Sequence, residues 1–287
     1  MGDKRILADI FISGLILGGL LALLSLGFAL IRGVARVFNL AHGSLFMLCA
    51  YYIYSLLFLG LWPAIIISSI LTIITGILIF QFFIHPLRKK GVGAAVVTLS
   101  LAMFIEALVK LIVGPGSLSI PYVITGKTTI LGVPVVNQKL LSLIVSIVIV
   151  VILALFINRT RIGKSIKAVA QNMDVAKLVG INTRNTFMIS MGIAALLAGL
   201  AAVLFAPVYL VSPGSWTILY RSFPVIILGG IGSLKGAVIG AFILAFTETI
   251  VQFTFQTGYI PKIVTFAVMI AIIFIRPQGL FGKKIDE

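Results

Sequence analysis

Two acidic side chains in long apolar runs are the residues of this chain best suited to chemistry. The 287-residue sequence has only seven Asp and Glu. Glu106 and Lys110 are four positions apart, so on a helix both project from one side in the order that favours an ion pair. Glu248 stands between two threonines without a basic neighbour in sequence. A charge at the centre of a bilayer costs about 2.5–3.5 kcal/mol on insertion scales, so both acids should face the interior of a bundle.

These acids have two interpretations. Glu106 forms a structural ion pair with Lys110, or it lines a pathway for a solute; Glu248 is the stronger candidate for a functional role. The sequence has no Ser-His-Asp order, no paired catalytic carboxylates and no metal-ligand cluster. We therefore expect a chain that is not an enzyme and that holds no metal or cofactor of its own.

A short polar segment around His42 is a second candidate site. Asn39 is expected to cap the helix that begins near His42, and Gly43 follows directly. His42 is either a hydrogen-bonded histidine at the membrane interface or part of a gate. His85, the other histidine, lies at a distant helix end. The pattern therefore points to gating or packing rather than to a metal centre.

The composition is that of a polytopic membrane protein. Hydrophobic residues make up 61% of the chain and charged residues 10%, well below the roughly 25% of soluble domains. We expect an all-α fold in one domain over 1–287, with eight or nine membrane segments. The predicted segments are 10–31, 38–59, 62–84, 92–113, 140–157, 187–210, 236–256 and 259–275, with a shorter run at 222–232 that forms half a span.

The net charge of +15 would suggest nucleic acid as a partner of a soluble protein, but here the basic residues follow the loops. Most of the 22 Lys and Arg fall on one side of the predicted topology, and that side is expected to be cytoplasmic. The segments on that side are Arg32 to Arg36, Arg88 to Lys90, 158–186 and the C-terminal tail from Arg276. The loops 115–139 and 211–221 then lie outside, with a small cap or hairpin expected in the first.

The basic loop 158–186 has the pattern of an amphipathic helix. Its apolar residues recur at spacings of three and four and should share one face that needs a partner. These residues are Ile162, Ile166, Val169, Met173, Ala176 and Val179, with Lys164, Lys167 and Asp174 between them. We expect this helix to contact a separate subunit that supplies energy.

The run from Leu228 to Gly240 contains five glycines among thirteen residues, enough to interrupt a membrane helix. Backbone freed in this way must be satisfied by protein or by a wet cavity, and such interruptions often flank a transport pathway. Gly229, Gly230 and Gly232 are therefore candidate pathway or gating residues. Two tripeptides, Gly163-Lys164-Ser165 and Gly126-Lys127-Thr128, lack the earlier glycine of a phosphate-binding loop, so nucleotide binding by this chain is not expected.

Several fragments, in order, resemble the permease subunits of ABC importers for branched-chain amino acids, of the LivH type. They run over almost the whole chain: Phe38-Asn39-Leu40-Ala41-His42-Gly43, His85-Pro86-Leu87-Arg88, Arg159-Thr-Arg-Ile-Gly163, Leu178-Val-Gly-Ile-Asn182, Ala206-Pro207, Ser212-Pro213-Gly214, Leu228 to Leu234 and Arg276-Pro277-Gln278-Gly279-Leu280-Phe281. Where relatives often carry proline in the glycine-rich turn, this chain has Lys235.

The resemblance implies a machine whose energy comes from other subunits. It implies a coupling helix over Ile162 to Gly180, with Ala176 to Gly180 matching the importer motif loosely. The implied partners are a second related permease, two ATPases that bind ATP and Mg²⁺, and a periplasmic or surface-anchored binding protein, in a prokaryotic inner membrane with the C-terminus cytoplasmic. Leucine, isoleucine and valine are the expected cargo, moved by alternating access. Urea, short amides or other amino acids are the alternative cargo, and an ion-coupled secondary carrier is the rival mechanism.

Overall fold

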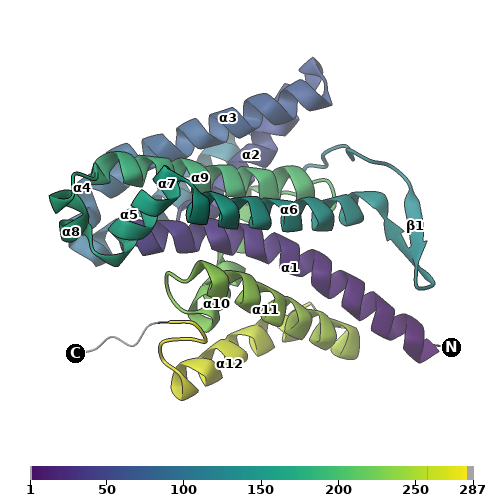
Figure 1. Ribbon diagram of the computed structural model, residues 1–287. Coiled ribbons are helices and arrows are strands. Elements are labelled where there is room, and N and C mark those ends of the chain that lie inside the picture. The colour runs from purple at the N-terminus through teal and green to yellow at the C-terminus, as the bar shows by residue number, and fades with distance from the viewer. Residues whose placement is uncertain (1, 257, 283–287) are drawn as a thin grey trace.

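The computed structural model of the chain describes residues 2–256 and 258–282 as a bundle of helices with one small β-hairpin (Figure 1). The predicted all-α polytopic membrane fold is confirmed. The α-helices are α1 (Gly2–Ala35), α2 (His42–Leu56), α3 (Leu61–Ile79), α4 (His85–Leu87), α5 (Gly91–Val113), α6 (Asn137–Arg159), α7 (Arg161–Gln171), α8 (Met173–Leu178), α9 (Thr183–Phe205), α10 (Leu219–Gly229), α11 (Leu234–Phe255) and α12 (Ile260–Ile275). Short segments of other helix types are η1 (Leu57–Leu59), η2 (Phe80–Ile84), η3 (Arg88–Lys90) and η4 (Pro213–Ile218), and the strands are β1 (Lys127–Ile130) and β2 (Val133–Val136).

Seven helical segments in the described part of the chain are long and apolar enough to cross a bilayer. They are Arg5–Ala35, His42–Leu59, Leu61–Leu87, Gly91–Val113, Asn137–Arg159, Thr183–Phe205 and Leu234–Phe255. The shorter apolar helix α12 and the pair η4 and α10 supply the remaining predicted segments. The half-span predicted at 222–232 corresponds to α10, which begins three residues earlier and ends at Gly229, and η4 precedes it within the loop predicted at 211–221.

Helix α1 is the centre of the bundle. It contacts α6, α7, α9, α10 and α11, and most of its length is buried. Small residues make these approaches close: Gly18 faces the ring of Phe242, and a Cβ at Gly19 would lie 3.1 Å from the Cβ of Ser146. Small residues allow helix backbones in a membrane bundle to approach closely, and the first helix of this chain is packed in this way.

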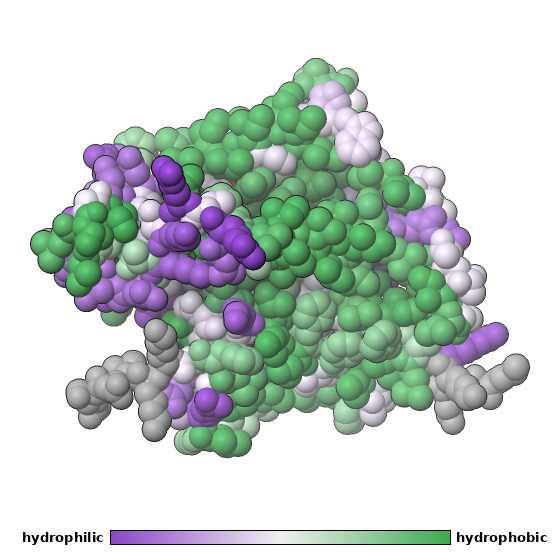
Figure 2. All heavy atoms as spheres, viewed as in Figure 1, coloured by the Kyte–Doolittle hydropathy of each residue, from purple (hydrophilic) through white to green (hydrophobic). Residues whose placement is uncertain are grey.

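The bundle has two chemically different ends (Figure 1). The N-terminus and the β-hairpin lie at one end, which we call the hairpin end, while α4, α7, α8 and the C-terminal segment lie at the other, which we call the basic end. Figure 2 shows hydrophilic residues gathered around α7 at the basic end and a broad hydrophobic surface over most of the rest of this face. The two ends thus separate the loops as the charge pattern predicted, since 158–186 and 115–139 lie at opposite ends.

The hairpin expected in the loop 115–139 is present. Strands β1 and β2 pair antiparallel with Lys127 opposite Val136 and Ile130 opposite Val133. Leu131 and Gly132, which join them, both have positive φ, the backbone that a two-residue hairpin turn requires.

The glycine-rich run allows α10 and α11 to meet backbone to backbone. A Cβ at Gly229 or at Gly236 would overlap the backbone of the other residue, and a Cβ at Gly240 would lie 2.7 Å from the carbonyl oxygen of Val225. The C-terminal segment closes over this contact, because the amides of Leu280 and Phe281 donate to the carbonyls of Leu228 and Gly229 at 2.8 and 3.1 Å. The helix interruption predicted here is confirmed, and its backbone groups are satisfied by protein.

Replacing Gly236 by alanine tests this contact. We expect Gly236→Ala to destabilise the bundle by more than the roughly 1–3 kcal/mol typical of overpacking, because the neighbour is backbone and cannot rotate away. Thermal unfolding of the purified protein in detergent measures the effect. Gly192→Ala is the matched control, since its Cβ would make only ordinary contacts of 3.5 Å or more with the side chains of Ile73 and Ile77. Equal unfolding temperatures for the two variants would contradict the packing argument.

Candidate functional site

A non-helical stretch between α1 and α2 passes into the interior of the bundle. Residues 36–41 are outside both helices, and the Leu40 amide donates to the Thr98 hydroxyl of α5 at 3.0 Å. The buried Asn39 accepts from the Ala41 amide at 3.1 Å and points its own amide towards the sulfur of Met191. Asn39 was expected to cap the second helix. It instead stabilises the turn just before it, because the helix begins at His42 without a side-chain cap.

His42 is completely buried behind this turn. Its ring lies against α1, where a Cβ at Gly27 would come within 2.8 Å of its Cε1 atom, and its centroid is 6.2 Å from that of Phe28. A glycine at position 27 therefore makes room for the imidazole. Neither ring nitrogen of His42 has a hydrogen-bond partner in the described residues, so the hydrogen-bonded histidine of one interpretation is not found.

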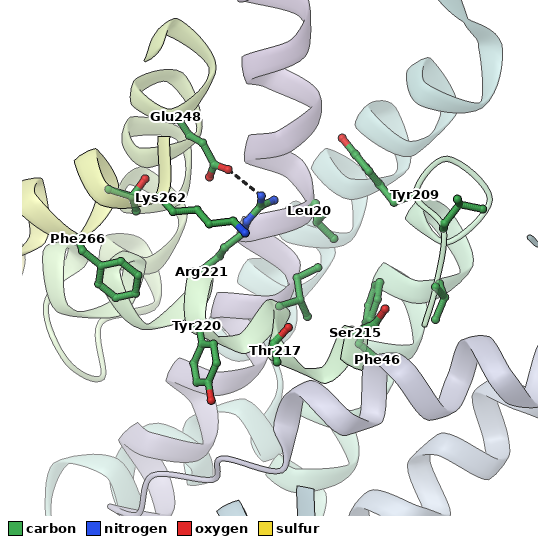
Figure 3. Close-up of a pocket in the computed structure, with 14 residues that line it drawn as sticks. Leu20, Phe46, Tyr209, Ser215, Thr217, Tyr220, Arg221, Glu248, Lys262 and Phe266 are labelled. Carbon is green, nitrogen blue, oxygen red and sulfur yellow. Dashed lines mark ion pairs between the residues drawn. The ribbon is translucent and has the colours of Figure 1, made fainter. Parts of the chain in front are cut away.

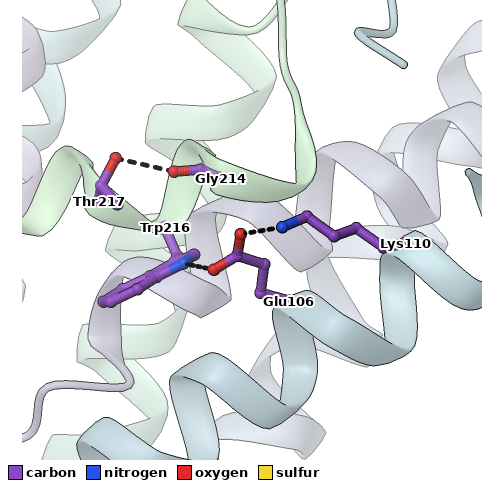
Figure 4. Close-up of polar contacts among 5 residues, drawn as sticks. All are labelled: Glu106, Lys110, Gly214, Trp216 and Thr217. Carbon is purple, nitrogen blue, oxygen red and sulfur yellow. Dashed lines mark hydrogen bonds and ion pairs between the residues drawn. The ribbon is translucent and has the colours of Figure 1, made fainter. Parts of the chain in front are cut away.

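Gly43 connects this turn to η4. A Cβ at Gly43 would overlap the carbonyl group of Trp216, so only glycine permits α2 and η4 to approach this closely. The indole of Trp216 is 5% exposed and donates from Nε1 to Oε2 of Glu106 at 2.5 Å (Figure 4). The other carboxylate oxygen of Glu106 accepts from Lys110 at 2.6 Å.

The predicted ion pair between Glu106 and Lys110 is thus confirmed, and the structure adds a partner that sequence reasoning missed. Trp216 contacts both Gly43 and Glu106. These two residues, with His42 beside Gly43 in sequence, therefore lie in one region where α2, α5 and η4 meet. Pairing with a cation and an indole N–H is how a carboxylate becomes tolerable in a membrane bundle. Nothing in the spacing of the sequence links Trp216 to Glu106, which lies 110 positions earlier.

Glu248 lies in a different place and has a different partner. Its carboxylate is 6% exposed, and its Oε1 is 2.8 Å from Nη2 of Arg221 on α10 (Figure 3). The pair lines a cavity of about 430 Å³ that also contains Lys262, from the first turn of α12. Sequence reasoning singled out Glu248 because this acid has no basic neighbour in sequence. It missed Arg221 and Lys262, because each stands beside an apolar run without a motif.

The candidate glycines of the interrupted helix lie away from both acids. Gly229 and Gly230 pack against α11 and the C-terminal segment, and Gly232 lies beside Gly33 near the end of α1. Gly230 and Gly232 both have positive φ. The structure therefore gives these three residues a place in a tight turn at the basic end, and it does not bring them to Glu106 or to the cavity around Glu248.

The amphipathic loop forms two helices rather than one. The side chain of Thr160 caps α7 by accepting from the Gly163 amide at 3.0 Å, and Asn172 ends α7 and caps α8 by accepting from the amides of Asp174 and Val175. The chain turns after α8 at Gly180, where φ is +82°. The single helix predicted over Ile162 to Gly180 is therefore corrected to a bent pair, because Asn172 satisfies the first amides of a new helix.

The predicted partner-facing surface of this loop is also corrected. Ile166, Val169 and Ala176 are at most 2% exposed, and α7 contacts α1, α6 and α9 of the same chain. Met173 is half-buried against the same core. Most of the apolar face is thus an anchor, because burial of these side chains within the chain stabilises the loop on its own bundle.

A smaller apolar surface remains free at the tip of the loop. Leu178 is 86% exposed and Val179 is 70% exposed, with Val175 and Ile162 also exposed. Charged side chains surround it: Lys177 pairs with Asp174 at 3.2 Å, Lys164 is exposed, and Lys167 donates to the side chain of Asn158. We call Val175, Leu178 and Val179 the exposed tip of α8. An apolar tip with a charged rim is typical of a protein contact.

Comparison with known proteins identifies the family of the chain. The family described as branched-chain amino acid transport system / permease component matches residues 10–273. The chain belongs to this family. Its curated relatives include the high-affinity branched-chain amino acid transport system permease protein BraD of Pseudomonas aeruginosa (28% identical, covering 95% of this chain and 94% of BraD) and LivH of Salmonella typhimurium (27% identical, covering 94% of each). A probable LivH of Methanocaldococcus jannaschii is 27% identical over 98% of this chain and 93% of that protein. No solved structure gives a significant match.

Membership of this permease family, together with the seven apolar spans, makes the chain a multi-pass membrane protein of a transport system. The family match includes the turn at Asn39, the acids Glu106 and Glu248, and the whole of α7 and α8. The regions singled out by the structure are thus part of the permease itself.

The hydrogen bond between Trp216 and Glu106 gives a direct prediction. Trp216→Phe should lower the free energy of unfolding by roughly 1–3 kcal/mol, because it leaves one carboxylate oxygen of Glu106 without its donor in a partly buried setting. Denaturant unfolding in detergent measures the change. The chain offers a matched control in its only other tryptophan, Trp62, whose side chain is 64% exposed. If Trp62→Phe is as destabilising as Trp216→Phe, the contribution of the hydrogen bond is disproved.

Substitutions on the two faces of the α7 and α8 pair should have different effects, because the buried face anchors the pair to the bundle and the exposed tip of α8 is free for a protein contact. We expect Ile166→Asp to prevent correct assembly of the bundle, because it places an unpaired carboxylate in a site that is 2% exposed. Leu178→Asp should leave the yield and unfolding temperature of the isolated permease unchanged, since Leu178 lies free at the tip. Size-exclusion profiles and thermal unfolding of the two variants distinguish these effects. A folded Ile166→Asp protein of normal stability would show that the anchor is assigned wrongly.

Proposed function

We propose that this chain is a permease subunit of an ATP-driven ABC importer that carries leucine, isoleucine and valine across the membrane by alternating access. The observation that carries the proposal is the α7 and α8 pair, held rigidly to the bundle by its buried face and presenting an apolar tip at the basic end. The family match and the similarity to BraD and LivH, which are named as branched-chain amino acid permeases, support the same cargo.

In this proposal the exposed tip of α8 docks on an ATPase subunit. Movement of the ATPases on binding ATP and Mg²⁺ would then pass through α7 to α1, α6 and α9, which α7 contacts directly. Because packed helices move as rigid bodies, a displacement at the tip can rock the bundle between outward-open and inward-open states. The guanidinium of Arg36 adds a link between α1 and the end of α7 by donating to the carbonyl of Gln171 at 3.3 Å.

The remaining partners follow from the two ends of the bundle. The basic end and the C-terminus face the cytoplasm of a prokaryotic cell in this proposal, as the distribution of Lys and Arg favours. A periplasmic or surface-anchored binding protein would deliver cargo at the hairpin end, where β1, β2 and the bridge between Leu118 and Val211 form the surface. A second, related permease would complete the membrane part, with two ATPases beneath it.

Reconstitution of the complete importer tests the proposal. Proteoliposomes that contain this chain, its partner permease, two ATPases and the binding protein should accumulate radiolabelled leucine only with ATP on the ATPase side. Leu178→Asp should reduce ATPase binding and uptake by roughly tenfold or more, since hot-spot truncations cost 2 kcal/mol or more. Ser100→Ala, at an exposed position on α5 outside the proposed docking surfaces, is the control.

Each other outcome has a distinct meaning. If the binding protein stimulates ATP hydrolysis but leucine is not taken up, the chain is still an importer subunit. Its cargo would then be urea, short amides or other amino acids. Uptake by this chain alone, abolished when an ion gradient is collapsed, would replace the importer by a secondary carrier.

A further inference from the structure

The cavity around Glu248 is formed by parts of the chain that are distant in sequence. Its volume is about 430 Å³, within the roughly 300–1,000 Å³ of ligand pockets. Helices α1, α2, α10, α11 and α12 contribute to it, together with η4 and residues 209–211. The bridge of Val211 to Leu118 and the position of Lys262 in the first turn of α12 place it towards the hairpin end.

The charges of the cavity are unusual for a membrane protein. Among its lining residues two are basic, Arg221 and Lys262, and one is acidic, Glu248. Arg221 and Glu248 form an ion pair at 2.8 Å, and no ion pair involves Lys262 in the described part of the chain. The cavity therefore has one positive charge in excess, and charges held inside a membrane bundle are costly unless they serve a solute or one another.

The remaining walls are largely apolar and aromatic, with the hydroxyl-bearing residues Ser215, Thr217 and Thr265 among them. Leu20, Phe46 and Phe266 lie around the charged groups, and Figure 3 shows Arg221, Lys262 and Glu248 directed into the same space. A cavity with an ammonium group, a guanidinium group and a carboxylate beside apolar side chains is complementary to a zwitterion that carries an apolar substituent. Guanidinium groups bind carboxylates in a two-pronged geometry, and a carboxylate is the natural acceptor for an ammonium group.

We propose that this cavity is a transient binding site for the cargo, in which Glu248 receives the α-ammonium group, Arg221 and Lys262 receive the α-carboxylate, and Leu20, Phe46 and Phe266 contact the apolar side chain. The assignment rests on the proposed import of branched-chain amino acids and adds the residues that recognise them. In the empty site the ion pair of Arg221 with Glu248 keeps both charges satisfied. When the cargo binds, Arg221 and Glu248 separate, and each pairs instead with the charged group of opposite sign on the amino acid.

The position of the two partners connects the site to the moving parts. Arg221 is on α10, which follows η4 and the Glu106 contact, whereas Glu248 is on α11. A shift of α12, which carries Lys262, relative to the joined α10 and α11 would take one of the two basic groups away from the carboxylate of the cargo. The amino acid can then be released towards the basic end without a chemical step, because the binding groups are no longer in the positions that hold its two charges.

Uptake by the complete importer tests the site. Lys262→Gln and the charge-exchanged double variant Arg221→Glu/Glu248→Arg should each lower leucine uptake by roughly tenfold or more, because each removes or reverses a charge-assisted contact with the cargo. The double variant can re-form an ion pair, and Lys262 has none in the described residues, so folding should be retained. ATP hydrolysis stimulated by the loaded binding protein should remain within about twofold of wild type, since α7 and α8 are unchanged. Ser100→Ala on α5, an exposed residue that does not line the cavity, is the control.

A second readout locates the cargo directly. A diazirine analogue of leucine, supplied on the binding protein and photolysed during turnover, should label peptides that contain Leu20, Phe46 or Phe266 in wild type but not in the double variant. Normal uptake by Lys262→Gln and the double variant, labelling confined to other segments, or loss of stimulated ATP hydrolysis together with uptake would each overturn the assignment. Failure of wild type to show any ATP-dependent uptake would instead refute the proposed function on which it rests.

Discussion

Irregular backbone inside a membrane bundle must find its hydrogen-bond partners within the protein, and most of this structure follows from that constraint. The chain leaves α-helical geometry at residues 36–41 and again at residues 206–218, the second of which includes the 3-10 helix η4. The first break is satisfied by Thr98 and Asn39, and the second by the capping contacts of Ser212 with Ser215. The two breaks meet where Gly43 contacts Trp216, so each supports the other.

The same constraint explains where charges are placed. Glu106 and Glu248 each have a basic partner and lie in different parts of the bundle. The partner of Glu106 is one helical turn away, and the indole of Trp216 fixes the pair to η4. The partner of Glu248 comes from another helix and shares a cavity with Lys262. We interpret the first arrangement as structural and the second as suited to a solute, because only the second leaves charge and space available.

Two kinds of contact hold neighbouring helices together as a unit: close packing at glycines at the basic end, and burial of the apolar face of α7. Contact of Gly229 with Gly236 joins α10 to α11, and Ile166 and Val169 join α7 to the central bundle. A transporter that receives its energy from outside the chain needs such rigid connections between the point where force arrives and the pathway. Here the exposed tip of α8 and the cavity around Glu248 lie towards opposite ends of the same packed unit.

The sequence by itself determined the class of fold, the approximate spans, the helix interruption at the glycines, the hairpin and the ion pair of Glu106 with Lys110. These depend on local patterns, namely apolar run length, glycine density and the spacing of four that one helical turn imposes. The tertiary structure alone decided that His42 is buried, that Ile166 and Val169 face the chain's own bundle, and that Trp216 and Arg221 reach the two acids. An amphipathic pattern shows that a face is covered but not by what, and a contact between residues 110 positions apart depends on how whole helices pack.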